Sequence, residues 1–136
     1  EVFGAVSVAR DGNVVAMVAS TSSHPNEVYA GTLRDRRLRR ATNSNPWLAN
    51  VALGRQETVT WTARDGERVE GVLVHPVNAA PGQRAPLAVL PHGGPEGVDL
   101  DGWNTRALYP VQVLAGQGYA VFMPNFRGSS NYGAKF

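Results

Sequence analysis

The chain has 136 residues, of which 43% are hydrophobic and 18% charged, and its formal net charge is +2. This composition is typical of a globular protein and excludes a low-complexity chain. No run of about 18 apolar residues occurs, so the sequence predicts neither a membrane-spanning helix nor a membrane partner. The absence of cysteine excludes disulfides, thiolate metal sites and cysteine nucleophiles. The compartment stays open, and a soluble protein, with the cytoplasm slightly favoured, is the expectation.

Short apolar runs separated by turn residues predict antiparallel strands in the first third of the chain. An Asp11-Gly12 pair between two such runs predicts a hairpin, because glycine accepts the positive φ that a tight turn requires. A third run at residues 27–33 and a possible fourth strand near residues 38–41 complete a meander. A meander of this kind suits one blade of a β-propeller, which buries its faces against neighbouring blades.

Five arginines crowd into residues 34–40. Clustered guanidinium groups attract phosphates and other anions. No aromatic residues are interleaved to stack bases, and the segment is typical of a solvated turn between strands. The sequence therefore predicts no nucleic-acid partner, while a non-catalytic module that binds an anionic partner stays open as an alternative.

A polar, proline-containing stretch at residues 43–54 predicts a connection between domains, with the boundary near Leu53. Beyond it, residues 57–63 and 67–74 flank the turn pair Asp65-Gly66. Their β-type alternation predicts a second hairpin.

In the rest of the chain the spacing of apolar residues changes. Residues 87–90 predict a short strand buried on both faces. Apolar spacings of three and four predict a helix over residues 105–115, with a later start if Pro110 lies in its first turn. Residues 119–123 predict another strand. The order strand, helix, strand predicts a parallel crossover in an α/β sheet.

The segment Pro91-His92-Gly93-Gly94-Pro95 directly follows the first of these strands. Glycines at a strand end let backbone N–H groups face a neighbouring site without interference from a Cβ atom. Preorganised N–H donors can stabilise the oxyanion of a tetrahedral intermediate. Taken alone, the segment could equally be a Gly-Gly turn with an incidental histidine.

A second segment, PNFRGSSNYG at residues 124–133, follows the next strand. With PHGGP and then GYAVFMPNFRGSSNYG, the sequence resembles the prolyl oligopeptidase family, in its acylaminoacyl-peptidase and dipeptidyl-peptidase-like branch. The resemblance implies an incomplete fold in two parts. Residues 1–53 would be the C-terminal blade of a β-propeller and its connection. Residues 54–136 would be the N-terminal part of an α/β-hydrolase domain, truncated before the nucleophile.

The implied function is hydrolysis of short acylaminoacyl or oligopeptide substrates by Ser-His-Asp acyl transfer, with a peptide as partner, no cofactor and no metal. Carried over, His92-Gly93-Gly94 is the oxyanion-hole segment, with the N–H of Gly93 or Gly94 as donor and the His92 side chain facing the site. Arg127 could bind substrate, although a structural role is favoured for it, and Asn125 and Tyr132 are expected to pack loops.

The other catalytic residues of a serine hydrolase are not found in the sequence. No Gly-x-Ser-x-Gly elbow occurs, so nucleophile, acid and base are all expected to be absent and the chain alone is expected to be inactive. His24 and His75 precede the oxyanion segment and are expected to be ordinary surface residues. An esterase or lipase with the same glycine device remains an alternative, and the sequence leaves peptide specificity and oligomeric state open.

Overall fold

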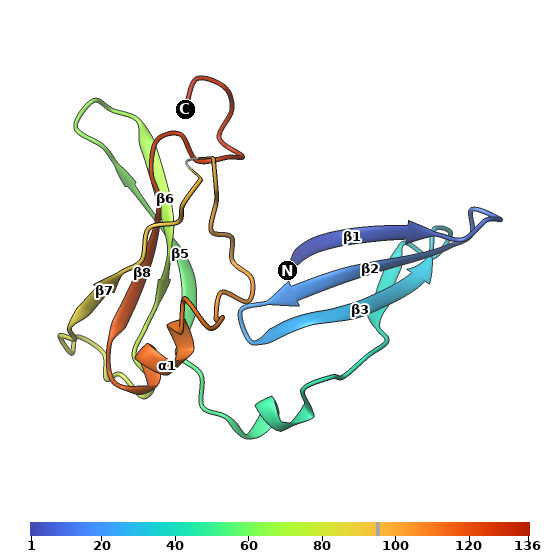
Figure 1. Ribbon diagram of the computed structural model, residues 1–136, viewed down its shortest axis with the longest axis horizontal. Helices are drawn as coiled ribbons and strands as arrows, with labels where there is room; N and C mark the ends of the chain where they lie inside the picture. The colour runs from blue at the N-terminus through green and yellow to red at the C-terminus, as the bar shows by residue number, and fades with distance from the viewer. Residues whose placement is uncertain (95) are drawn as a thin grey trace.

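The computed structural model describes residues 1–94 and 96–136, which form two four-stranded sheets joined by a connection with one turn of 3-10 helix (Figure 1). The strand orders are β1-β2-β3-β4 and β5-β6-β8-β7. The elements are β1 (Val2–Val8), β2 (Val14–Thr21), β3 (His24–Thr32), β4 (Arg37–Arg40), η1 (Pro46–Asn50), β5 (Gln56–Thr62), β6 (Arg68–Val74), β7 (Leu87–Val89), α1 (Val111–Gly116) and β8 (Ala120–Asn125).

The first sheet is an antiparallel meander, which confirms the strands predicted from turn residues, including the fourth. At the first turn, the Asp11 side chain accepts a hydrogen bond from the Asn13 N–H at 3.0 Å, and Gly12 has a φ of 71°. The apolar residues that this sheet buries are Val15, Ala19 and Tyr29. Local turn chemistry therefore sets the path of the chain through this sheet.

The second sheet mixes pairing directions. The predicted hairpin around Gly66, with φ of 88°, joins β5 to β6. β6 pairs antiparallel with β8, and β7 pairs parallel with β8, the direction that the crossover predicted. The buried core lies between this sheet and α1, and it consists of Val72, Val74, Val111, Ala115, Val121 and Met123.

The predicted fold class, an α/β-hydrolase portion preceded by the last part of a β-propeller, is wrong: the described residues form a mostly β structure with a single α-helix of six residues. Pro110 stands at the N-cap, because its ring would clash inside a helix, and Leu108, expected on the apolar face, is 88% exposed. β7 is not buried on both faces, since Leu87 and Val89 are 57% and 51% exposed. One short helix cannot cover the faces of a parallel sheet.

Within the described ranges, neither helix is long and apolar enough to cross a bilayer.

The loop between β7 and α1 contacts both sheets. The Trp103 N–H donates to Ser20 Oγ of β2 at 3.3 Å, and the Gln56 side chain of β5 donates to Asp101 Oδ1 at 2.8 Å. A Cβ atom on Gly102 would lie 2.8 Å from a methyl carbon of Val2, so the backbone packs closely there. In Figure 1 the chain rises beside the second sheet after β7, and the orange part of the loop then descends toward the first sheet.

Candidate functional site

The His92-Gly93-Gly94 segment leaves the sheet directly after β7. Gly93 and Gly94 are exposed, and neither N–H donates to an acceptor among the residues described. Gly94 has a φ of 143°, and a Cβ atom there would lie 2.6 Å from the amide nitrogens of Glu96 and Gly97. A Cβ atom on Gly93 would meet open space. Of these two positions, only position 94 therefore requires glycine. Pro95, the end of the PHGGP motif, lies outside the described residues.

His92 is held by the loop that follows β8. Its Nε2 lies 2.8 Å from Ser129 Oγ, and its ring stacks on Phe126 with centroids 4.5 Å apart and planes at 19°. Its Nδ1 lies 3.0 Å from the Gly93 carbonyl oxygen, and Gly97 leaves room for the ring, because a Cβ atom there would lie 2.7 Å from Nδ1. The imidazole thus connects the glycine segment to the end of β8.

The serine and histidine of this pair do not have the arrangement of a catalytic dyad. Ser129 is 5% exposed, and its hydroxyl donates to the Phe126 carbonyl at 2.6 Å. A catalytic histidine is oriented through Nδ1 by a carboxylate, whereas Nδ1 of His92 faces a carbonyl. The pair therefore fixes loop geometry. Sequence reasoning missed Ser129, and the only signal was its place within residues 124–133.

Asn125, at the end of β8, is the polar centre that ties the loop after Gly94 to the sheet. It is 2% exposed, accepts from the Asp99 N–H at 2.8 Å and donates to the Asp99 carbonyl at 2.9 Å and to the Tyr132 hydroxyl at 3.0 Å. The Tyr132 hydroxyl in turn donates to Glu70 at 2.6 Å. Both residues pack loops, as the sequence predicted.

Burial raises the pKa of two ionisable groups in this network. It raises the pKa of the Asp99 carboxyl, against the opposing charges of His92 and Arg106. Burial and the hydrogen bond to Glu70 raise the pKa of Tyr132 to about 12. The neutral forms are favoured because charge is poorly solvated there.

Arg127 points to the β5–β6 turn. Its guanidinium forms an ion pair with Asp65 at 2.5 Å, which lowers the pKa of that carboxyl and raises the pKa of the arginine. The side chains are 49% and 57% exposed, so the pair contributes little to stability. Substrate binding by Arg127 stays a prediction.

The other two histidines lie away from the glycine segment and have partners of their own. His24 Nε2 lies 3.2 Å from the Tyr29 hydroxyl. His75 Nε2 lies 2.6 Å from Glu57, and hydrogen bonds from Arg55 and His75 lower the pKa of Glu57 to about 2. Within residues 1–94 and 96–136, no group of three or more side chains could hold a metal ion.

No family model matches the chain. Among curated proteins, it is 35% identical over 80 residues to dipeptidyl-peptidase 5 of Schizosaccharomyces pombe, which is 59% of this chain and 11% of that protein. It is 34% identical over 101 residues to dipeptidyl-peptidase 5 of Arthroderma otae, which is 74% of this chain and 14% of that protein. The chain thus spans a small part of the length of these relatives.

Solved structures that share the fold include two acylaminoacyl peptidases. The Pyrococcus horikoshii acylaminoacyl peptidase has a TM-score of 0.78 at 23% identity, over 96% of this chain and 20% of that one. An acylaminoacyl peptidase in complex with Z-Gly-Gly-Phe-chloromethyl ketone has a TM-score of 0.76 at 24% identity, over 96% and 19%. At these identities the likeness concerns the fold alone. Together with the sequence relatives, it makes the chain a partial match to the prolyl oligopeptidase family, homologous to serine peptidases of the dipeptidyl-peptidase 5 and acylaminoacyl-peptidase kinds over 11% to 20% of their length.

Proposed function

We propose that this chain supplies the oxyanion segment of a serine-type peptidase that hydrolyses short acylaminoacyl or oligopeptide substrates by Ser-His-Asp acyl transfer. The observation that carries the proposal is the pair of exposed glycine amides after β7. Neither amide has an acceptor among the residues described, so both are available to a ligand oxygen. The relatives, and a solved acylaminoacyl peptidase that holds a peptide chloromethyl ketone, support a peptide as substrate.

In this mechanism the N–H of Gly93 or Gly94 donates to the carbonyl oxygen of the scissile bond as negative charge develops on it. A donor that is already in place stabilises the tetrahedral intermediate without reorganisation. His92 supports the segment, because its ring is held between Phe126 and Ser129. The sequence contains no Gly-x-Ser-x-Gly elbow, so we expect the nucleophile to lie on chain outside these residues.

The test uses the full-length product of the natural gene and a matched pair of glycine variants. Alanine cannot adopt the φ of Gly94 without strain, and its Cβ atom would collide with the following backbone. We expect Gly94→Ala to lower kcat by about 10²–10³-fold with KM little changed, because the strain displaces the donor and the loss of one oxyanion donor usually costs this much. Gly93→Ala, which places its methyl group in open space, should keep most of the activity.

The substrates are paired amide and ester derivatives of acylated amino acids and short peptides. Turnover of esters alone would favour an esterase and contradict a peptidase. Normal amide turnover by the Gly94→Ala variant would remove the oxyanion segment from the mechanism. We expect the 136-residue chain alone to hydrolyse neither substrate.

A further inference from the structure

The outer edge of the first sheet carries two arginines, Arg37 and Arg39, that form no ion pair with any carboxylate in the part of the chain that the structure describes. Arg37 and Arg39 alternate along β4, so both project from the same face, and both are exposed. They line a pocket together with Ala30, Gly31, Thr32 and Asp35. A Cβ atom on Gly31 would lie 2.1 Å from the Arg37 carbonyl oxygen, so β3 and β4 pack closely beside the arginines.

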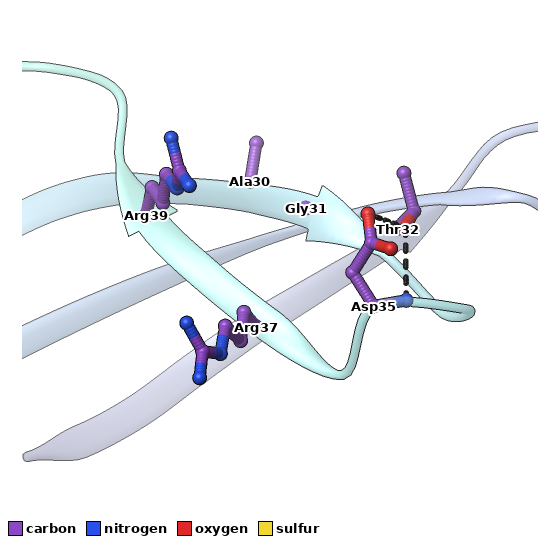
Figure 2. Close-up of a pocket in the computed structure, with 6 residues that line it drawn as sticks. All are labelled: Ala30, Gly31, Thr32, Asp35, Arg37 and Arg39. Carbon is purple, nitrogen blue, oxygen red and sulfur yellow. Dashed lines mark hydrogen bonds between the residues drawn. The ribbon is translucent and has the colours of Figure 1, made fainter.

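The nearby carboxylates are already engaged. Asp35 accepts a hydrogen bond from the Thr32 hydroxyl at 2.6 Å, and Figure 2 shows it turned toward that residue while the two arginine side chains extend from β4. Glu27 is bound on the opposite face by Arg40 at 3.1 Å. Among the residues described, Arg37 and Arg39 form no ion pair, so two guanidinium groups face solvent on the same short strand.

The free edge of β4 also offers hydrogen-bonding backbone. The Ala41 N–H donates to the Val28 carbonyl at 2.7 Å. Because pairing alternates in an antiparallel ladder, the backbone groups of Arg37 and Arg39 face β3. Those of Leu38 therefore point outward from the sheet. An added strand could pair with Leu38 while its alternate side chains, about 6.6–7 Å apart, meet the two arginines.

We propose that this arginine edge, Arg37–Arg40 with its pocket, binds an extended acidic peptide segment as a fifth strand. Carboxylates at alternate positions of the peptide would accept charge-assisted hydrogen bonds from Arg37 and Arg39. Nucleic acid fits less well, because the pocket lining contains no aromatic side chain to stack a base. The edge lies on a different sheet from the glycine segment, so the proposal is independent of peptidase chemistry.

The test is fluorescence anisotropy of a labelled peptide with glutamate at alternate positions, Glu-Val-Glu-Val-Glu, titrated with the full chain at low salt. We expect about tenfold weaker binding for each arginine reversed to glutamate. The matched control is Arg10→Glu with Arg64→Glu, which changes net charge equally at exposed turns. The control should bind within about twofold of the natural chain, because Arg10 lies in the β1–β2 turn and Arg64 in the β5–β6 turn, so neither is on β4, while a general charge effect would weaken both.

Two further arms separate strand addition from simple charge attraction. A Lys-Val-Lys-Val-Lys peptide should bind the Arg37→Glu, Arg39→Glu chain, and this rescue would also show that the variant folds. A glutamate peptide with N-methylated backbone should lose binding. Equal binding of the N-methylated peptide, equal loss in the control variant, or tighter binding of a single-stranded oligonucleotide would each overturn the proposal.

Discussion

Replacing Asn125 with alanine should detach the loop after Gly94 from the second sheet. The amide of Asn125 makes three hydrogen bonds inside the protein, two to the Asp99 backbone and one to Tyr132. At about 1 kcal/mol net for each bond, the loss is about 3 kcal/mol of the free energy of unfolding. The buried Asp99 N–H would also lose its acceptor, which adds to this cost.

The matched control is Asn104→Ala in the same loop. Asn104 makes a single exposed hydrogen bond, to the Leu100 carbonyl at 2.9 Å, so its removal should cost about 1 kcal/mol or less. Urea denaturation reports the difference as a lower midpoint at unchanged slope. Amide hydrogen exchange at Asp99 reports the local opening directly, and it should accelerate far more in Asn125→Ala than in the control.

The result that would refute this reasoning is a match between the two variants. If Asn125→Ala and Asn104→Ala shift the midpoint equally and leave exchange at Asp99 slow, the network around Asn125 does not hold the loop. An Asn125→Asp variant adds a check, since it keeps an acceptor for the Asp99 N–H and loses both donated bonds. Compared with Asn125→Ala, the Asn125→Asp variant should therefore recover at most one hydrogen bond, about 1 kcal/mol of the free energy of unfolding.

Three other predictions follow from packing and ionisation. Gly54→Ala should lower the free energy of unfolding by about 1–3 kcal/mol in urea denaturation, because its Cβ atom would lie 2.2 Å from the His75 carbonyl oxygen, whereas Gly116→Ala, in open space, should not. Hydrogen bonds from Thr42, Ser44 and Arg40 lower the pKa of Glu27 to about 2, so its stabilisation should be present above the ordinary value of 4.5 and fade as pH falls toward 2. When the free energy of unfolding is measured against pH, Glu27→Gln should lose the part that falls between pH 4.5 and about 2. An unchanged profile in this variant would contradict the role given to Glu27. Since the pKa of Tyr132 is raised to about 12, its stabilisation should be complete below 10 and fade as pH rises through 12; phenolate absorbance should lack its late-ionising step in Tyr132→Phe.

Predictions from local residue patterns succeeded where the physical cause is local. Asp11-Gly12 and Asp65-Gly66 are turns because glycine tolerates the positive φ that a tight reversal needs, and the strands beside them follow. The helix over residues 105–115 was predicted too long, because apolar spacing carries no information on what covers a face, whereas the later start with Pro110 at the first turn is confirmed. Pro110 and the exposed Leu108 confine it to six residues.

The sequence by itself determined the turns and the strands, and two of its segments carry the resemblance from which the peptidase function is proposed. Turns and strands depend on residues that lie close together in the chain, and the two segments can be read directly from the sequence. Only the tertiary structure decided that His92 rests on Phe126 and Ser129, that Asn125 binds the Asp99 backbone, and that Glu27 pairs with Arg40. These contacts join residues 13 to 37 positions apart, and chain pattern cannot specify which distant groups pair until the sheets bring them together.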